Sequence, residues 1–358
     1  MKIAELGWNS RFEKQLDKMN EPELFPARVC RQDREAYRVL GDFGERRAVV
    51  SGRFRLMATS AADYPAVGDW VAMRLPDASG DAIISAVLKR ESCISRKASA
   101  AGARTDEQIM AANVSTLFVV NGLDGGRSFN PRLLERYLTL AHSSGCMAVI
   151  LLNKADLCDD VEACVDAARD VAMGSPVLAM SALEGNGVER LEPFLSPGST
   201  VALVGPSGVG KSSLINRLAG IELQTGAVRD YDKRGRHTTT WREMAFLPSG
   251  AILIDTPGLR EVQLWADEDA LDSSFADIEA LAHDCRFRDC SHNGEPGCAV
   301  MEAVEKGDLD AGRLVGFHKL QKEARFLEIQ QDERLRIDEK KRQKQFRRHC
   351  RTVPKKRS

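Results

Sequence analysis

The segment that most constrains the fold of this chain is Gly205-Pro206-Ser207-Gly208-Val209-Gly210-Lys211-Ser212. It fits the pattern G-x-x-x-x-G-K-[ST] and lies between an apolar run at Val201–Val204 and a helix-forming run at 213–218. In a strand–loop–helix of this kind, the glycines let backbone N–H groups point at a phosphate beside the positive end of the helix. We therefore expect an α/β domain with a phosphate-binding loop. The alternative is a chance glycine-rich turn.

Individual residues of this loop have expected roles. Lys211 is expected to neutralise the β- and γ-phosphates of a nucleotide, and Ser212 to ligate Mg²⁺. The remaining residues of the loop, together with Ser213, are expected to line the phosphates. A second motif, Asp255-Thr256-Pro257-Gly258, follows the apolar residues 251–254. Its Asp255 is expected to hold the Mg²⁺ shell through water, and its Gly258 N–H to contact the γ-phosphate.

The segment Asn153-Lys154-Ala155-Asp156 follows an apolar strand predicted at 147–152 and indicates a guanine base. Asp156 can accept from two neighbouring N–H groups of guanine, whereas adenine offers an acceptor at one of those positions. Asn153 would tie the base loop to the phosphate loop, and the stem of Lys154 would cover one face of the ring. For these four residues alone, a solvated turn is the alternative.

A further strand end completes the predicted nucleotide site. Ser181-Ala182-Leu183 ends an apolar run at 176–182, where the Ala182 N–H would donate to the guanine oxygen. Near-continuous apolar runs at 116–121, 147–153 and 201–205 predict a parallel sheet buried on both faces. Between the first two runs, Asn130, Pro131 and Gly145 mark the ends of a helix. The domain is therefore expected to be doubly wound α/β.

The hydrolytic step is expected to depend on Gly235-Arg236-His237-Thr238-Thr239-Thr240. Thr240 is expected to close over Mg²⁺, with Thr239 as the alternative. Many GTPases place a water-orienting Gln directly after the Asp-x-x-Gly motif, but here that position is Leu259, which cannot hydrogen-bond water. His237 is the best candidate for orienting the attacking water. The alternative is that His237 packs in its loop or contacts a partner.

The order of the motifs indicates a circular permutation, because the guanine motif Asn153–Asp156 precedes the phosphate loop at Gly205. With these motifs, the chain resembles the ribosome small-subunit-dependent GTPase A (RsgA-type) family from about Phe25 to Gly316. The resemblance implies three domains: an N-terminal OB-fold β-barrel, a circularly permuted P-loop GTPase α/β domain and a C-terminal zinc-binding helical domain. It also implies a weak GTPase that the small ribosomal subunit stimulates late in subunit maturation. The family histidine implicated in hydrolysis matches His237.

Three of the cysteines lie close together in the sequence with a histidine, whereas the others are scattered along the chain. Cys285-x4-Cys290-x-His292-x5-Cys298 offers three thiolates and one imidazole, a closed set for one structural Zn²⁺, and the spacing matches the family. Coincidental cysteines are the alternative, and His283 is a spare ligand that the family comparison does not favour. Five other cysteines are interpreted as single, small buried hydrophobes: Cys30, Cys93, Cys146, Cys158 and Cys164.

Charge and strand patterns suggest contact with RNA. Residues 340–358 hold ten Lys or Arg and no acid; since the whole chain carries −1, residues 1–339 carry −11. Short predicted strands between about Phe25 and Arg96, including Arg53–Leu56, suggest a small barrel on which Arg53, Arg55 and Arg74 would contact RNA phosphates. Solvated strand faces and a solubilising tail are the alternatives.

The expected organisation is an extension at 1–24, a barrel at 25–100, a GTPase domain at 104–264, a zinc-binding domain at 265–330 and a basic tail at 331–358. The expected partners are GTP or GDP, the small subunit and its rRNA. The polar first twenty residues and the absence of a long apolar run favour a cytoplasmic protein without a membrane segment, and we expect a monomer. The rival functions are an RNA-binding scaffold with a degenerate nucleotide site, and a permuted GTPase that serves another RNA or the large subunit.

Overall fold

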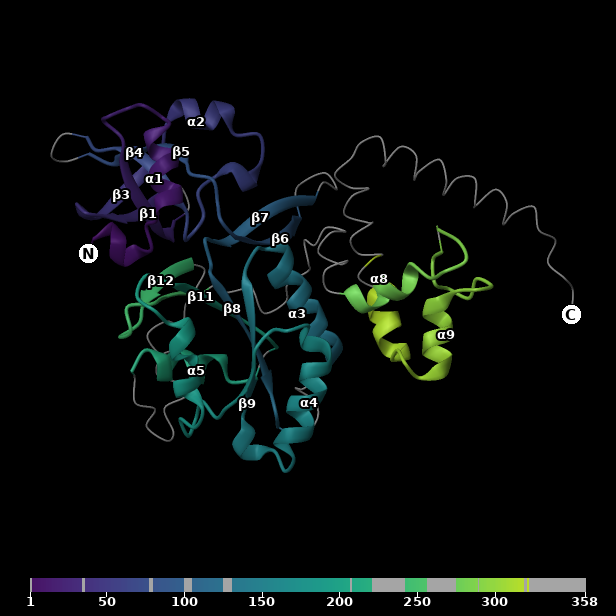
Figure 1. Cartoon of the computed structure of the whole chain (residues 1–358). Helices are drawn as coiled ribbons and strands as arrows, with labels where there is room; N and C mark the ends of the chain where they lie inside the picture. Colours follow the sequence, from purple (N-terminus) through teal and green to yellow (C-terminus); the bar gives the residue numbers. More distant parts are fainter. Residues whose placement is uncertain are drawn as a thin grey trace, which may run out of the picture. The chain divides into compact units, whose positions relative to one another are not determined.

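This computed structural model describes residues 2–33, 36–76, 80–99, 105–124, 131–206, 208–220, 242–255, 275–288, 290–318 and 321. The chain divides into two compact units (Figure 1). The first consists of residues 1–96 and 107–264, and the second of residues 97–106 and 265–358.

Five strands of the first unit close into a barrel. They are β1 (Phe25–Gln32), β2 (Tyr37–Gly41), β3 (Gly44–Val50), β4 (Trp70–Arg74) and β5 (Ala82–Val87), in the order β1-β2-β3-β5-β4. A β1–β4 pairing closes the ring, and β3–β5 is its parallel pair. Alternate residues such as Val29, Val39 and Ile84 are fully buried and fill the interior. The expected OB-fold barrel is confirmed.

The segment Arg53–Leu56 is a helix, and its prediction as a strand was wrong. The helix α2 (Gly52–Met57) connects β3 to the short helix η2 (Ala61–Asp63), and the side chain of Ser51 caps it by accepting from the Phe54 N–H at 3.0 Å. Four alternating residues are too few to distinguish a strand from a helical turn, so the cap decides. Within this helix only Phe54 packs against the barrel core, whereas Leu56 is 89% exposed.

Because this segment is helical, two of the arginines that were expected on the barrel strands lie on α2 instead. Arg53 and Arg55 lie on the exposed surface of α2 rather than on a strand. Arg74 ends β4, where its guanidinium lies 2.5 Å from a carboxylate oxygen of Glu21. The three arginines therefore do not form one row on a strand face.

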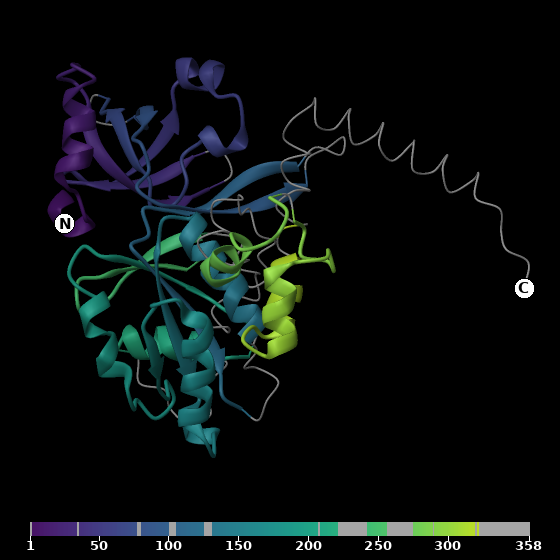
Figure 2. The ribbon, with the colours of Figure 1, turned by 45° about the vertical axis from the view of Figure 1, so that its right-hand side comes forward.

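The other part of the first unit is an α/β sheet. Its strands are β8 (Thr116–Gly122), β9 (Met147–Asn153), β10 (Val177–Ala179), β11 (Thr200–Val204), β12 (Arg242–Phe246) and β13 (Ile252–Asp255). Their order is β10-β9-β8-β11-β13-β12, with β12 antiparallel to β13 and the other pairs parallel. Helices α3 (Pro131–Ser143) and α4 (Val161–Ala172) pack side by side, as Figure 2 also shows. Helix α5 (Lys211–Leu218) packs on the opposite face through Leu214.

The strand order places a topological switch point between β8 and β11. From β8 the chain runs outward to β9 and β10, then returns to the centre at β11 and continues to β13 on the other side. In open α/β sheets ligands bind outside the carboxyl ends of the strands at such a point. The phosphate loop begins there, directly after β11. The expected doubly wound sheet is confirmed, and its guanine-motif strand β9 precedes β11 in the chain.

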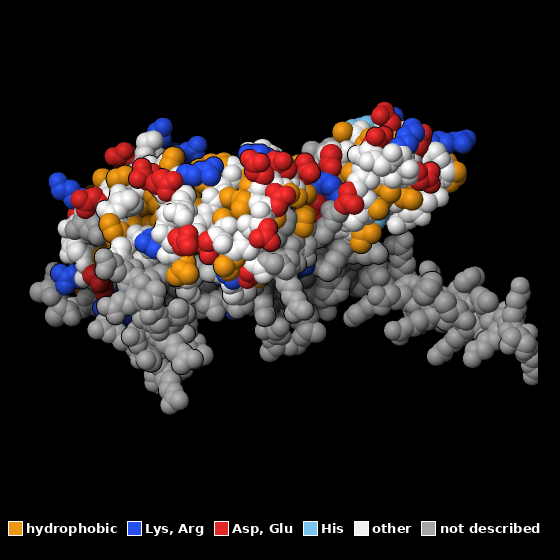
Figure 3. All heavy atoms as spheres, turned by 90° about the horizontal axis from the view of Figure 1, so that it is seen from below, with side chains coloured by type: hydrophobic (Ala, Val, Ile, Leu, Met, Phe, Trp, Pro, Cys, Tyr) orange, Lys and Arg blue, Asp and Glu red, His pale blue; other side chains and the backbone are white. Residues whose placement is uncertain are grey.

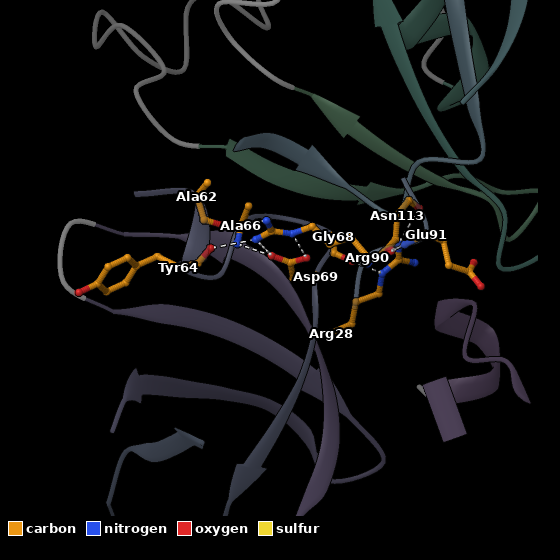
Figure 4. A network of polar contacts seen from close by, with 9 residues as sticks. All are labelled: Arg28, Ala62, Tyr64, Ala66, Gly68, Asp69, Arg90, Glu91 and Asn113. Carbon is orange, nitrogen blue, oxygen red and sulfur yellow. Dashed lines mark hydrogen bonds and ion pairs between the residues drawn. The ribbon is translucent and has the colours of Figure 1, made fainter. Parts of the chain in front are cut away.

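The barrel and the sheet are joined within the first unit. Strand β1 pairs with β12 through Arg31↔Glu243 and Gln32↔Arg242. Nearby, the buried guanidinium of Arg28 donates to carbonyl oxygens of several segments, and the carboxylate of Asp69 pairs with Arg90 at 2.7 Å (Figure 4). Two helical segments precede the barrel, η1 (Ile3–Leu6) and α1 (Ser10–Asp17), and a hairpin of β6 (Cys93–Ser99) and β7 (Thr105–Ala112) follows it.

The second unit contains α8 (Ala276–Ala282), α9 (Ala299–Lys306) and a helix at 311–318. Phe275 and Phe317 stack edge to face in its core, with ring centroids 5.4 Å apart. Arg313 pairs with Asp277 through two hydrogen bonds of 2.6 and 2.7 Å, and its guanidinium lies over the Phe275 ring. The helical character expected of this domain is therefore confirmed.

Candidate functional site

Two glycines shape the phosphate loop. Gly205 has a φ of 144°, and a Cβ atom there would lie 2.1 Å from the carbonyl oxygen of Val120 on β8. Gly210 has a φ of 93°, and a Cβ atom there would lie 2.2 Å from Nδ2 of Asn153. Both positions therefore require glycine for the close approach of neighbouring segments as well as for the backbone angle.

Lys211 begins α5 directly after Gly210, and its ammonium group reaches back over the loop. It donates to the carbonyl oxygens of Gly205 at 2.6 Å and Pro206 at 2.5 Å. Ser212 is exposed in the first turn of the same helix, and Ser213 follows it. A cation and the amino end of a helix thus converge on the loop, which is the arrangement that binds a phosphate.

Asn153 connects three motifs that are far apart in the sequence. Its Nδ2 donates to the carbonyl oxygen of Val209 in the phosphate loop at 2.8 Å, and its Oδ1 accepts from the Ala182 N–H at 2.8 Å. The side chain is buried, so both bonds are shielded from water. The structure therefore brings the guanine motif, the strand end at Ser181–Ala182 and the phosphate loop together, as the sequence analysis expected.

The Ala182 N–H has a different hydrogen-bond partner from the one predicted. It was predicted to donate to guanine, but here it donates to Asn153. From the other side, α5 supports the same strand end, since the guanidinium of Arg217 donates to the carbonyl oxygens of Ala182 at 3.2 Å and Leu183. Ser181 accepts from the Glu184 N–H at 3.2 Å and orders the following turn. Base recognition by Ala182 stays a prediction.

Asp156 is exposed on the short helix η3 (Ala155–Leu157), which follows β9 at the edge of the site. Before it, Lys154 adopts a left-handed backbone with a φ of 65°, which is uncommon for a residue with a side chain. Its ammonium group pairs with the Asp124 carboxylate at 2.5 Å. The sequence analysis did not single out Asp124, whose signal was its position just after the strand β8.

The remaining predicted residues of the hydrolytic site are only partly described. Asp255 ends β13, which pairs with the phosphate-loop strand β11. Ser207, His237, Thr240 and Gly258 lie outside the described residues, as does Leu259. Their roles stay predictions.

The predicted metal ligands of the second unit form a compact cluster. The ligand atoms of Cys285, Cys290, His292 and Cys298 all lie within 4.8 Å of one another. Nδ1 of His292 is 3.6 Å from the Cys285 sulfur and 3.5 Å from the Cys298 sulfur, and the two sulfurs are 3.9 Å apart. Zinc–ligand bonds of about 2.0–2.3 Å in a tetrahedron produce separations of this size. The donor set and its geometry therefore fit a Zn²⁺ ion.

A carboxylate fixes the loop that carries these ligands. Glu295 accepts from the N–H groups of Ser291 at 3.1 Å and Asn293 at 2.8 Å. These bonds, led by the one from the Ser291 hydroxyl, lower the pKa of Glu295 to about 2. His292 has a φ of 57°, and its carbonyl oxygen lies 3.3 Å from Nε2 of His318. His283 is not among the four clustered ligands.

Several known proteins are similar to this chain over most of its length. The family model described as RsgA GTPase matches residues 87–265. The small ribosomal subunit biogenesis GTPase RsgA of Opitutus terrae is 45% identical over 333 residues, which cover 90% of each chain. RsgA 1 of Oceanobacillus iheyensis is 42% identical over 348 residues, which cover 97% of this chain and 98% of that protein.

Two solved structures also match. YjeQ from Thermotoga maritima superposes with a TM-score of 0.62 at 27% identity, over 84% of this chain and 98% of that one. YloQ, described as a circularly permuted GTPase, superposes with a TM-score of 0.58 at 24% identity, over 85% and 96% of the two chains, and supports the fold. The chain belongs to the RsgA GTPase family.

Proposed function

We propose that this chain binds the small ribosomal subunit and hydrolyses GTP to GDP and phosphate late in subunit maturation. Hydrolysis is stimulated by the subunit and coupled to release from it. One observation carries the guanine-nucleotide part of the proposal: the Asn153 side chain joins the guanine motif to the phosphate loop. The ribosomal part rests on the relatives, which are named as small ribosomal subunit biogenesis GTPases.

Each of the following residues has a separate role in binding GTP. Asp156 accepts from the guanine edge, while the stem of Lys154 covers the base. The ammonium group of Lys211 exchanges its carbonyl partners for phosphate oxygens, and it neutralises the negative charge that develops on them. Ser212, which is exposed in the first turn of α5, and Asp255, the last residue of β13, are proposed to hold Mg²⁺. Mg²⁺, when bound there, would neutralise negative charge on the phosphates.

We assign the orientation of the attacking water to His237 and the closure over Mg²⁺ to Thr240. The support is chemical: the position after Gly258 is Leu259, which offers no hydrogen bond to water, whereas an imidazole at neutral pH does. A His237→Ala variant that binds GTP normally but retains full subunit-stimulated turnover would remove this role.

The cluster of Cys285, Cys290, His292 and Cys298 is proposed to hold one structural Zn²⁺. With four protein ligands the ion has no open position, so it stabilises the fold rather than activating water. We further propose that the protein acts in the cytoplasm as a monomer. Among the helices that are described, none is long and apolar enough to span a bilayer.

RNA contact is proposed through the barrel and the basic residues 340–358. On the face in Figure 3, acidic and basic side chains of the described residues are interspersed. The excess of positive charge lies in residues 340–358, where ten cations and no acid predict salt-dependent attraction to phosphates.

The test is GTP turnover by the full chain with and without purified small ribosomal subunits. We expect slow turnover alone and at least about tenfold faster turnover with small subunits, a ratio that corresponds to about 1.4 kcal/mol in the barrier. Large subunits serve as the control. Turnover that is the same under all three conditions would remove the ribosomal assignment and leave the GTPase.

A further inference from the structure

Cys158 and Cys164 form a pair of thiols beside the guanine motif. Their sulfur atoms lie 3.9 Å apart, and both side chains are partly exposed. The interpretation of these two cysteines as single buried residues was therefore wrong. The chain brings them together because it turns at Asp160, whose side chain caps α4 by accepting from the Ala163 N–H at 3.0 Å.

The pair is connected to the residue expected to recognise guanine. The Cys158 N–H donates to the Ala155 carbonyl oxygen at 3.3 Å and so closes the η3 turn that contains Asp156. On the other side of this turn, the Ala155 N–H donates to the Met180 carbonyl oxygen at 3.0 Å. A backbone displacement of Cys158 would therefore act directly on the three-residue turn that contains Asp156.

We propose that Cys158 and Cys164 are a redox-sensitive dithiol, and that their oxidation to an intramolecular disulfide weakens guanine-nucleotide binding. A disulfide requires a sulfur–sulfur distance of about 2.05 Å, so the two sulfur atoms approach by roughly 2 Å. The regular backbone hydrogen bonds of α4 resist this movement more than the short η3 turn does. A binding group needs its position held to within about 0.5 Å, so a fraction of the movement misplaces Asp156.

The oxidant in this step is a disulfide of low molecular weight, such as oxidised glutathione. The thiolate of one cysteine attacks the reagent, forms a mixed disulfide and expels one small thiol. The second cysteine then attacks the mixed disulfide, which forms the Cys158–Cys164 bond and expels the second small thiol. The two protons of the cysteines end on the two released thiols, and the reagent accepts both electrons.

The surroundings of Cys164 slow the reaction of the pair with a small disulfide. Burial and the neighbouring thiol of Cys158 raise the pKa of Cys164, and the charge of Asp160 acts in the same direction. A protonated thiol is a poor nucleophile, so exchange proceeds when oxidant accumulates and not at the basal level.

The experiment equilibrates the full chain with mixtures of reduced and oxidised glutathione. Trypsin then releases both cysteines in a single peptide, 155–169, because no Lys or Arg lies between Lys154 and Arg169. We expect this peptide to become lighter by two hydrogens in mass spectrometry. The dissociation constant for GTP should rise by about fivefold in parallel and should recover on reduction, a change small enough to reflect a shifted contact rather than an unfolded site.

The double variant Cys158→Ser/Cys164→Ser is the matched control, since it keeps the cysteines of the metal cluster. It should bind GTP like the reduced protein and should not respond to oxidised glutathione. The proposal is overturned if peptide 155–169 never loses two hydrogens, if the disulfide forms without a change in GTP affinity, or if the control responds equally. The nucleotide readout rests on the proposed function: if the reduced protein does not bind GTP, that function fails, while the peptide mass still decides whether the disulfide forms.

Discussion

Arg28 on β1 donates from Nη2 to the side-chain oxygen of Thr200 at 2.9 Å, and both residues are buried. Thr200 is the first residue of β11, the strand that leads into the phosphate loop. The same guanidinium donates to the carbonyl oxygens of Leu6 at 2.5 Å and Gly68 at 3.2 Å. One buried cation therefore joins the N-terminal extension, the barrel and the central strand of the GTPase sheet.

Because Arg28 and Thr200 share a hydrogen bond, substitutions of the two residues should have non-additive effects on the free energy of unfolding. Thr200→Val keeps the shape of the side chain but removes the acceptor, so we expect a loss of about 1.5–3 kcal/mol in the free energy of unfolding. Arg28→Met should cost more, about 3–5 kcal/mol, because it leaves several buried carbonyl groups unpaired. With Arg28 already replaced, Thr200→Val should cost less than about 0.5 kcal/mol. Urea denaturation measures all four proteins, and equal costs in both backgrounds would contradict the coupling.

Asn153→Ala should weaken binding of GTP and GDP by at least about tenfold, or 1.4 kcal/mol. The variant loses the bonds to Val209 and Ala182, so the guanine motif and the phosphate loop are no longer held together. Asn186→Ala is the matched control, because its side-chain amide donates to Glu184 on a neighbouring turn at 2.9 Å. Fluorescence titration with a labelled guanine nucleotide checks both. Similar affinities for the two variants would show that Asn153 does not organise the site.

Gly210→Ala should have nearly the same effect as Asn153→Ala, for a steric reason. The added methyl group would lie 2.2 Å from Nδ2 of Asn153 and would push the amide from its partners. Gly208→Ala is the control: its φ of 84° is equally unfavourable for alanine, but nothing lies within 4 Å of the added carbon. We expect the nucleotide dissociation constant of Gly210→Ala to exceed that of Gly208→Ala by about tenfold. The reverse order would contradict this account.

The sequence predicted the parts of the site whose chemistry depends on residues that are adjacent in the chain. The loop from Gly205 to Ser212 and the motif Asn153–Asp156 need a fixed local spacing, so a single chain reveals them. The cluster of Cys285, Cys290, His292 and Cys298 is local in the same way. The apolar strands were predictable because a parallel sheet buries both of its faces.

The structural features that could not be predicted from the sequence depend on contacts between residues far apart in the chain, or on very short segments. Arg28 and Thr200 are 172 positions apart, and no local pattern predicts that a strand arginine will be buried against a strand threonine. The pairs Asp124–Lys154 and Cys158–Cys164 depend on where turns place their ends. Arg53–Leu56 was predicted as a strand because its four residues alternate. The segment belongs to helix α2 instead, since the side chain of Ser51 caps the helix.

Asp124→Asn should weaken GTP and GDP binding equally, by about threefold to fivefold, since a partly exposed ion pair contributes up to about 1 kcal/mol. The Asp124 carboxylate pairs with the ammonium group of Lys154, so its loss frees the side chain that we propose covers the base. Asp166→Asn is the control, because Asp166 pairs with Arg169 on the exposed surface of α4. Competition titrations with GTP, GDP and ATP check the effect. A change in the preference for guanine over adenine would contradict it, because we assign that preference to Asp156.

Cys298→Ser should abolish metal binding at the proposed structural zinc site of the second unit. Its sulfur lies 3.5 Å from Nδ1 of His292 and also accepts from the Met301 N–H at the start of α9, so the substitution affects both a ligand and a helix cap. We expect zinc content to fall from about one ion per chain to near zero, because a hydroxyl is a poor replacement for a thiolate ligand. Amide hydrogen exchange at 275–318 should accelerate, since metal binding is coupled to folding in small domains of this kind.

The matched control for that measurement is Cys164→Ser, which removes a thiol outside the cluster. It should retain its zinc and keep slow exchange at 275–318. Treatment of the unmodified chain with a strong chelator should reproduce the Cys298→Ser exchange pattern, and added Zn²⁺ should reverse it because the ligands themselves remain intact. If the chelated chain keeps slow exchange in this segment, the helices are held by packing around Phe275 and Phe317 alone, and the metal has no structural role.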